Sequence, residues 1–233
     1  MKGIVTSIDC TRVNGDERES RRETVATESN MQLLVNGEVS TNFLYSRGLD
    51  EQLVVGHLVS SGIIQDLSDI EKLEIGDGKA EIWIEQRSEH KKEIQDIGLS
   101  ISHRQLLDVR TKLLNNQKHH KATRGFHGAI ILELSTGRWF MCEDIGRHNA
   151  VDKVIGHGIQ NGFNCSQSMV LLSGRLVSDI VIKCVNSRIP LIASITVATD
   201  GGIKLAVESN FTIIGSLSED GFWLYNEGVV KVT

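Results

Sequence analysis

The chain has 233 residues, of which 40% are hydrophobic and 24% charged, as expected for a soluble globular protein of one large or two small domains. Its net charge of −5 argues against broad nucleic-acid binding, which needs a basic surface, but is compatible with a local basic pocket for one phosphorylated ligand. No apolar run approaches the roughly 18 residues of a membrane span. Four cysteines without a Cys-x-x-Cys pair, and no signal peptide, predict free thiols in the cytoplasm.

The N-terminal region predicts a polar arm followed by a β-hairpin. Residues 11–30 are rich in Arg, Glu, Ser and Thr, and their alternating charges indicate an exposed or partly disordered arm. Two short apolar runs follow, separated by Asn36-Gly37. Because this dipeptide fits a tight primed turn, we expect a hairpin over residues 31–44.

A helix and a strand are expected before a domain boundary. Apolar residues recur at helical spacing over residues 50–61, with Asp50 as the expected cap. Residues 79–86 alternate between apolar and charged side chains, which predicts a half-exposed strand. The polar stretch 87–98 is the candidate boundary. The expected domains are therefore a smaller β-rich domain with its polar arm, residues 1–98, and a second domain, residues 99–233.

Strand and helix patterns alternate in the second domain. A helix is predicted over residues 102–115, and residues 115–121 predict a polar loop. The adjacent His119 and His120 in that loop are better explained as solvated side chains than as metal ligands. A hairpin over 128–142 follows, and the alternation after it predicts a mostly parallel sheet with helices on both faces. The further expected elements are helices near 147–160, 176–187 and 201–209, and strands near 168–172, 191–195, 211–215 and 222–225.

The stretch from Glu143 to Lys153 predicts a strand that turns into a helix at Gly146. Polar side chains at such a turn can face a ligand, because the first helical N–H groups have no partner and favour an anion. The alternative is a solvated turn with a helix cap and a surface ion pair. We expect Asp144 to hold Arg147 or His148 in place, with His148 directed at the ligand. The candidate binding residues in this turn are Asp144, Gly146, Arg147, His148 and Asn149.

Two later turns have a similar composition. In a parallel sheet these turns lie at the carboxyl ends of the strands, where ligands bind. Arg147 and Arg175 can then clamp a phosphate or carboxylate, unless they pair with Asp144 or Asp179. His127 lies close to glycines, so it can approach a ligand or simply cap a strand. The further candidates are His127, then Ser173, Gly174 and Arg175, and then Thr199, Gly201 and Gly202.

Several familiar catalytic sites are excluded. Cys142 and His148 are six residues apart with no further ligand at zinc spacing, and the zinc deaminase signature is missing. Neither a P-loop nor a Gly-x-Ser-x-Gly elbow is present. Cys142 precedes the polar turn and is a candidate reactive thiol, because the N-terminus of the next helix would favour a thiolate. A buried cysteine that packs as a small hydrophobe is the alternative.

Taken together, these motifs resemble those of the FdhD family of formate dehydrogenase accessory sulfurtransferases. The resemblance is most specific over residues 143–156 and covers most of the chain from about Glu23. It extends through the following segments: 172–175, Val181, Lys183, 189–193, 205–208, 212–215 and Tyr225 in the second half, with 125–129 before them, and 36–37, 55–58 and 61–64 in the first half.

The resemblance implies an α/β (α+β overall) architecture, with a cytidine-deaminase-like three-layer αβα C-terminal domain and a smaller β-rich N-terminal domain. It implies a homodimer that carries sulfur from a cysteine desulfurase to the molybdenum bis-guanine-dinucleotide cofactor, before this cofactor enters formate dehydrogenase. GDP or GTP would mimic a fragment of that cofactor, and neither nucleic acid nor a membrane is an expected partner. A further cofactor-binding stretch is implied at Ile214, Gly215, Ser216, Leu217, Ser218 and Glu219.

The sequence departs from the family pattern in two places. Ser216, Leu217 and Ser218 replace aromatic and basic residues, and residues 98–104 contain no cysteine where the family has its persulfide-carrying Cys-x-x-Cys. One hypothesis is therefore a sulfurtransferase that uses another thiol, with Cys142 as the candidate. The second is a non-enzymatic chaperone that binds the cofactor or guanine nucleotides and has lost the sulfur-carrying cysteines. A nucleotide-binding regulator is a third, weaker hypothesis.

Overall fold

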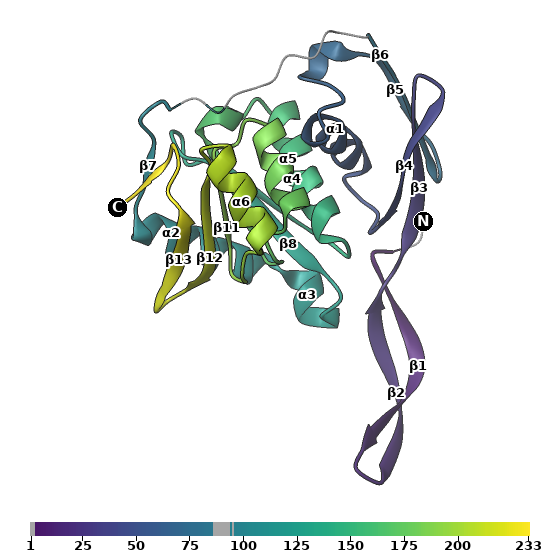
Figure 1. The fold of residues 1–233 in the computed structure, drawn as a ribbon. Coiled ribbons are helices and arrows are strands. Elements are labelled where there is room, and N and C mark those ends of the chain that lie inside the picture. Colours follow the sequence, from purple (N-terminus) through teal and green to yellow (C-terminus); the bar gives the residue numbers. More distant parts are fainter. Residues whose placement is uncertain (1–2, 86–93, 95) are drawn as a thin grey trace.

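The computed structural model describes residues 3–85, 94 and 96–233, and it begins with a hairpin that projects from the body (Figure 1). Most side chains on both strands of this hairpin are exposed, and its turn places Gly15 at a φ of 59°. The predicted exposure is confirmed, but the segment is a regular ladder of paired residues and not a partly disordered arm. The two strands are β1 (Val5–Asn14) and β2 (Glu17–Ala26).

A four-stranded sheet follows, with the strand order β4-β3-β6-β5. Asn36 and Gly37 both have positive φ at the turn between β3 and β4, which confirms the predicted hairpin. Alternate residues of β3, such as Met31 and Leu33, are buried against α1, which lies between this sheet and the rest of the molecule (Figure 1). The elements are β3 (Ser29–Val35), β4 (Glu38–Tyr45), α1 (Asp50–Ser60), β5 (Ile70–Ile75) and β6 (Lys79–Ile84), with a 3₁₀ turn, η1, at Leu67–Asp69.

The predicted cap of α1 is wrong by one residue. Leu49 occupies the N-cap position, with φ 60° and no side-chain capping bond. Asp50 lies in the first helical turn, where its carboxylate accepts hydrogen bonds from the Gly48 N–H at 2.9 Å and the Tyr45 hydroxyl at 3.1 Å. Asp50 therefore fixes the loop that enters the helix. The predicted boundary at 87–98 falls largely on residues outside the described ranges.

The second domain is built on a six-stranded sheet with the order β13-β12-β11-β10-β8-β9. The central strands β10, β11 and β12 are parallel, whereas the pairs β12–β13, β10–β8 and β8–β9 are antiparallel. The predicted mostly parallel sheet is therefore mixed, because a hairpin closes it at each end. The strands are β8 (His127–Glu133), β9 (Trp139–Asp144), β10 (Ser168–Leu172), β11 (Leu191–Ser194), β12 (Thr212–Ser218) and β13 (Gly221–Asn226).

Helices cover both faces of this sheet and bury two separate apolar cores, as expected for the three-layer αβα arrangement. One face packs against α4, α5 and α6, and the other against α2. The C-terminal strand β14 pairs with β7 beside α2. No helix in the described ranges combines the length and hydrophobicity needed to cross a membrane. The bounds are β7 (Ser100–Ile101), α2 (His103–Asn116), α4 (Arg147–Gln160), η2 (Cys165–Gln167), α5 (Ser178–Asn186), α6 (Asp200–Glu208) and β14 (Lys231–Val232).

A short helix, α3 (Lys118–Thr123), replaces the loop predicted at 115–121. Its first N–H groups are satisfied from outside the helix, because both carboxylate oxygens of Glu143 accept hydrogen bonds from the backbone of His119 and His120, at 2.8 and 2.7 Å. A carboxylate at this end also complements the helix dipole. The prediction failed because the stabilising residue lies on another element, β9.

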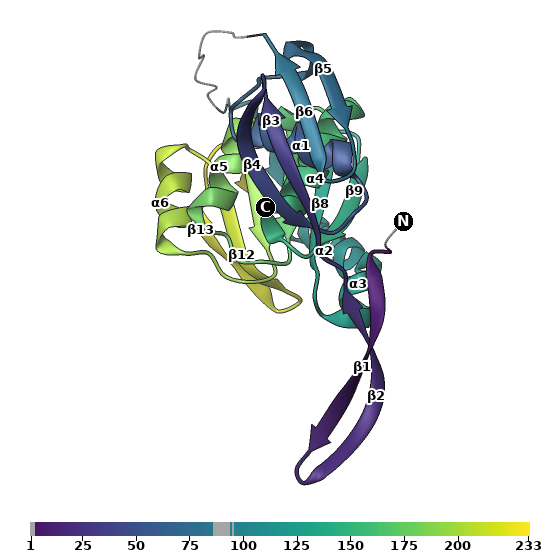
Figure 2. The same ribbon diagram turned by 90° about the vertical axis from the view of Figure 1, so that its right-hand side faces the viewer.

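The two domains meet where α1 crosses α4 (Figure 2). Glycines allow the helices to approach closely: a methyl group on Gly56 would lie 1.8 Å from the backbone oxygen of Asp152, and one on Gly156 would lie 2.0 Å from that of Gln52. Beside this crossing, the buried carboxylate of Asp152 accepts hydrogen bonds from Ser60 of α1 and Lys183 of α5. Polar and backbone contacts therefore fix the position of α1 on the second domain.

Candidate functional site

The three predicted turns lie at one edge of the six-stranded sheet. Because β9 and β10 are both antiparallel to β8, their carboxyl ends lie beside the start of β8, and His127 pairs with Asp144 in the ladder. The second and third turns contact each other directly, since the N–H of Leu176 donates to the carbonyl of Val197 at 3.1 Å and Thr199 donates to Leu176 at 3.0 Å. The turns therefore lie next to one another as predicted, whereas ligand binding by them stays a prediction.

His127 and Arg147 lie against Gly174 at the centre of this edge. A methyl group on Gly174 would lie 3.1 Å from Cδ of Arg147 and 3.4 Å from Nδ1 of His127. A larger residue at this position would therefore have to displace the Arg147 or His127 side chain by a few tenths of an ångström. Burial lowers the pKa of His127, and the charge of Arg147 lowers it further. These two effects favour neutral imidazole, which can donate or accept a hydrogen bond.

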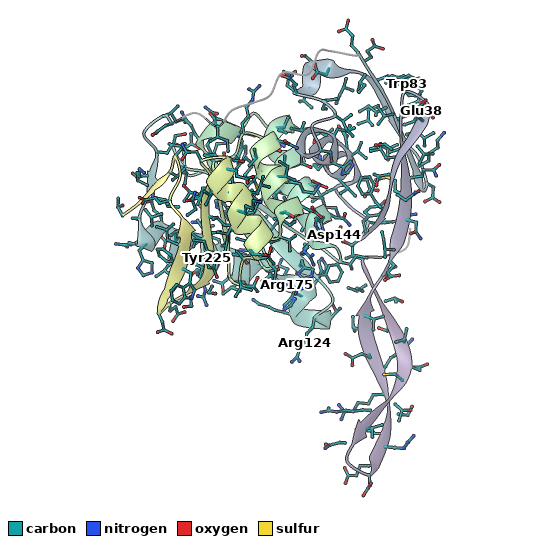
Figure 3. The ribbon with its side chains drawn as sticks, viewed as in Figure 1. Glu38, Trp83, Arg124, Asp144, Arg175 and Tyr225 are labelled. Atoms are coloured by element: carbon teal, nitrogen blue, oxygen red, sulfur yellow. The ribbon has the colours of Figure 1, made fainter. Side chains whose placement is uncertain are left out.

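Within the described part of the chain, neither Arg147 nor Arg175 makes an ion pair. The alternative in which these arginines pair with Asp144 or Asp179 is therefore wrong. Nε of Arg147 is buried and has no hydrogen-bond partner there. Arg175 is exposed, and it lies at the same end of the second domain as Arg124 in Figure 3. An anionic ligand could satisfy both guanidinium groups.

In the described part of the chain, Asp144 makes no hydrogen bond or ion pair with Arg147 or His148, contrary to expectation. Its fully buried carboxylate accepts hydrogen bonds from Nζ of Lys153 at 2.6 Å and from the backbone N–H of Ser46 at 3.2 Å. It also accepts from the Gly146 N–H at 2.9 Å and Nδ2 of Asn149 at 3.0 Å. Asp144 and Asn149 are therefore structural residues of the turn.

Gly146 itself is the N-cap of α4, without a side-chain capping bond. His148 follows in the first helical turn and is half-buried. Burial lowers the pKa of His148, and the charges of Arg147 and Lys183 lower it further. The first turn of α4 therefore offers a neutral histidine beside a cationic arginine, and no acid of this turn is free to oppose an anion.

In the other two turns, many predicted residues have internal roles. Oγ of Ser173 accepts a hydrogen bond from the Gly128 N–H at 2.9 Å. Thr199 caps α6 by accepting from the Gly202 N–H at 3.4 Å, and a methyl group on Gly202 would lie 2.5 Å from the carbonyl oxygen of Leu176. Gly201 has open space beyond Ser178, at 3.8 Å, and remains available to a ligand.

Residues 214–218 form the end of β12 and Glu219 follows in the turn, and most of this stretch is committed to packing. Ile214 and Leu217 are buried in the core beside α2. A methyl group on Gly215 would lie 2.5 Å from the ring of Tyr225 and 3.1 Å from the carbonyl oxygen of Thr196, so only glycine fits between this ring and the third turn. The remaining members are held by local contacts: Ser216, at a φ of 53°, donates its N–H to Thr196, Ser218 donates to Gly221, and Glu219 pairs with Arg110.

Sequence reasoning missed one wall of the site. A cavity of about 560 Å³ lies between α3 and the edge of the sheet, and His127 and Ser173 form part of its lining. The cavity is lined by no carboxylate, although the chain as a whole is acidic. The signal for it was the basic run from Lys118 to Arg124, which the prediction of a solvated loop passed over. The basic residues that line it are His120, Lys121, Arg124 and His127.

The structure opposes a thiolate at Cys142. This cysteine is buried, and its Sγ donates to the carbonyl of Ala150 at 3.4 Å. Burial raises the pKa of the Cys142 thiol to about 12, although Lys153 acts in the opposite direction. The residue therefore packs as a small hydrophobe of the core. In the described ranges, no three His, Cys, Asp or Glu side chains are grouped as a metal would require.

Known proteins match this chain over most of its length. The FdhD/NarQ family model matches residues 26–98 and 89–229. Protein FdhD of Methanocaldococcus jannaschii is 30% identical over 228 residues, covering 97% of this chain and 98% of that protein. Sulfur carrier protein FdhD of Methanothermobacter thermautotrophicus is 28% identical over 243 residues, covering 96% and 97%.

A solved structure shares the fold. The crystal structure of a protein from Desulfotalea psychrophila, assigned as a formate dehydrogenase accessory protein, superposes with a TM-score of 0.84 over 96% of this chain and 97% of that chain, at 24% identity. That likeness supports the architecture alone. The match to the family model extends over both domains. The chain belongs to the FdhD/NarQ family.

Proposed function

We propose that this chain is an accessory protein of formate dehydrogenase maturation that binds the molybdenum bis-guanine-dinucleotide cofactor at the carboxyl edge of the six-stranded sheet. The observation that carries the proposal is the state of Arg147, whose buried Nε lacks a hydrogen-bond partner and whose guanidinium makes no ion pair in the described ranges. A phosphate would supply the missing acceptor, because arginine binds phosphate through charged, bidentate hydrogen bonds.

The residues at this edge fit an anionic dinucleotide. Arg147 and Arg175 would hold phosphate groups, His127 would donate or accept one hydrogen bond, and the cavity lined by Lys121 and Arg124 offers further positive charge. When bound, the cofactor would supply the molybdenum centre. The protein would orient its phosphates and shield it from water, and none of these roles needs a reactive thiol.

The sulfur-transfer part of the family function is supported less by this chain. Relatives are named sulfur carrier proteins, yet residues 98–104 contain no cysteine and Cys142 is held in the core. We therefore favour cofactor binding over sulfur carriage. A cysteine desulfurase as sulfur donor, formate dehydrogenase as the client and a homodimer are further parts of the proposal, and they rest on the family relationship.

Calorimetry with GDP tests the binding site, since GDP represents one arm of the cofactor. We expect Arg147→Ala to weaken GDP binding by about 2–3 kcal/mol, because a charged contact is lost. Arg12→Ala is the matched control: it removes an exposed arginine from the projecting hairpin and should leave the affinity unchanged. Equal affinities of wild type and Arg147→Ala, with both proteins folded, would rule out this site.

A further inference from the structure

Strand β9 has a free edge. It is the terminal strand of the six-stranded sheet, and among the residues that the structure describes it pairs with β8 alone. The N–H of Glu133 donates to the Arg138 carbonyl at 2.9 Å, and hydrogen-bonded and non-hydrogen-bonded pairs alternate from that point along an antiparallel ladder. Trp139, Met141 and Glu143 therefore turn their backbone N–H and C=O groups away from β8. An edge of this kind is a template for another strand.

A groove follows this edge. A cavity of about 500 Å³ is lined by every residue of β9 from Trp139 to Glu143. Consecutive residues of a strand point to opposite faces of the sheet, so the lining wraps around the edge itself. Phe140 and Cys142 face α4, where the Phe140 ring stacks on His157, whereas Met141 packs with the core beside α2. The opposite wall includes Ile4 and residues 47–49.

The charge available in this groove is positive. Lys118 is exposed and makes no ion pair within the described part of the chain, and Arg47 is about one-third exposed beside its partner Asp77. The lining contains one acid, Glu143, and both of its oxygens accept hydrogen bonds from α3. An entering carboxylate would therefore meet Lys118 without competition from a free acid.

We propose that the groove along β9 binds an extended, acidic segment of a partner protein by adding it as a strand to the six-stranded sheet. The backbone groups of Trp139, Met141 and Glu143 supply the main-chain hydrogen bonds of such a complex, as in other peptide complexes formed by strand addition. Acidic side chains on one face of the segment lie near Lys118, and apolar side chains on the other face lie near Phe140. This site is independent of the proposed cofactor site.

A synthetic peptide in which valine and glutamate alternate, capped at both ends and labelled with a fluorophore, tests the proposal by fluorescence anisotropy. We expect saturable binding below about 1 mM, which is weak but measurable. Two further peptides carry methyl groups on alternate backbone nitrogens, one on the odd-numbered and one on the even-numbered residues. One of the two should bind at least roughly fivefold more weakly than the unmethylated peptide, because its main-chain hydrogen bonds to β9 are lost. This comparison uses the unaltered protein, so no folding defect can affect it.

Two substitutions test the groove from the side of the protein. Met141→Pro removes an outward N–H that does not bond to β8, and proline is tolerated on edge strands. Met141→Ala, which keeps the N–H and loses the same packing against the core beside α2, is its control. Lys118→Glu reverses the free charge, and Lys204→Glu is its control because Lys204 is exposed on the distant helix α6. We expect Met141→Pro and Lys118→Glu to weaken peptide binding and the two controls to leave it unchanged.

Three results would overturn the proposal. No saturable binding of the glutamate peptide up to about 1 mM would do so, as would equal binding of a peptide in which lysine replaces glutamate. In the third, the protein self-associates in sedimentation experiments and Met141→Pro makes it monomeric, which would assign the edge to a second copy of the chain. The GDP measurements are unaffected by any of these results, so this inference can fail while the proposed function stands.

Discussion

The carboxylate of Asp144 and the ammonium group of Lys153 form a buried ion pair, with Oδ2 and Nζ 2.6 Å apart and exposures of 0% and 1%. Lys153 also donates to the backbone oxygen of Ser46, at 2.7 Å. The pair therefore joins the turn after β9 to the loop that precedes α1. The turn and the position of the first domain depend on the same two charges.

Replacing Lys153 should destabilise the whole chain. In Lys153→Met the carboxylate of Asp144 stays buried without its cation, which typically costs about 3–5 kcal/mol in the free energy of unfolding. Urea unfolding followed by circular dichroism measures this loss. Lys204→Met is the control, since Lys204 is exposed and should change stability by no more than about 0.5 kcal/mol. A similar small effect of Lys153→Met would show that the buried pair contributes little.

The helix crossing should be intolerant of a single methyl group. Gly56→Ala would place Cβ 1.8 Å from the backbone oxygen of Asp152, so α1 and α4 would have to separate. We expect a loss of at least about 2 kcal/mol in the free energy of unfolding.

Gly201→Ala is the matched control for this crossing. Gly201 is also helical, but its added Cβ meets Ser178 at an ordinary 3.8 Å, and a helical alanine reduces backbone entropy in the unfolded chain. We expect this variant to be neutral or stabilised by up to about 1 kcal/mol. Equal stabilities for the two variants would mean that α1 moves freely on α4.

Neutral histidines at the site should make stability depend on pH. Burial lowers the pKa of His127 and His148 in the folded chain, so the unfolded chain binds protons first as the pH falls. The contribution of these histidines to stability is then complete above their unfolded pKa of about 6.5, and it is lost as the pH falls toward their lower pKa values in the folded chain. Urea unfolding measures the free energy of unfolding at about pH 7.5 and about pH 5.5, on the two sides of this window. Between these pH values, His127→Gln should lose less of that free energy than wild type does. An unchanged loss would contradict the role of His127.

The parts of the fold that the sequence predicted are those governed by local patterns. Helix α4 and strand β10 have the predicted bounds, because one repeats apolar residues at helical spacing and the other is continuously apolar. The convergence of the three turns was also predictable, since strand direction fixes where they lie. The mixed sheet was not predictable, because it depends on the pairing of β8 with β10, two strands that are remote in sequence.

Long-range contacts explain the errors at the site. Asp144 was expected to orient its neighbours Arg147 or His148. Its partners instead include Ser46, 98 residues earlier, and Lys153, nine residues later in α4. Glu143 supports α3, which is 24 residues earlier. Without α3 in place, the basic cavity beside His127 cannot be recognised in the sequence. Residue types were sufficient to predict which edge of the sheet carries the candidate site. Tertiary contacts were needed to separate the residues that support this edge from those available to a ligand.

The last prediction concerns Cys142, the sequence-based candidate for sulfur transfer. Its thiol should react slowly with iodoacetamide near neutral pH, because alkylation needs a thiolate and burial raises the pKa of this thiol to about 12. Cys10 on the projecting hairpin is partly exposed and should react faster, which provides an internal comparison in the same sample. Mass spectrometry of each thiol, with and without urea, measures both rates.

The same measurement extends to sulfur transfer itself. After incubation with a cysteine desulfurase and labelled cysteine, we expect no persulfide on Cys142, since a buried thiol cannot meet the donor. Stoichiometric persulfide at this position, absent from Cys142→Ser, would show instead that β9 opens and that the chain carries sulfur on a relocated thiol. Absence of persulfide from every cysteine would support a binding role, because the carboxyl edge offers charge and hydrogen bonds but no accessible sulfur nucleophile of its own.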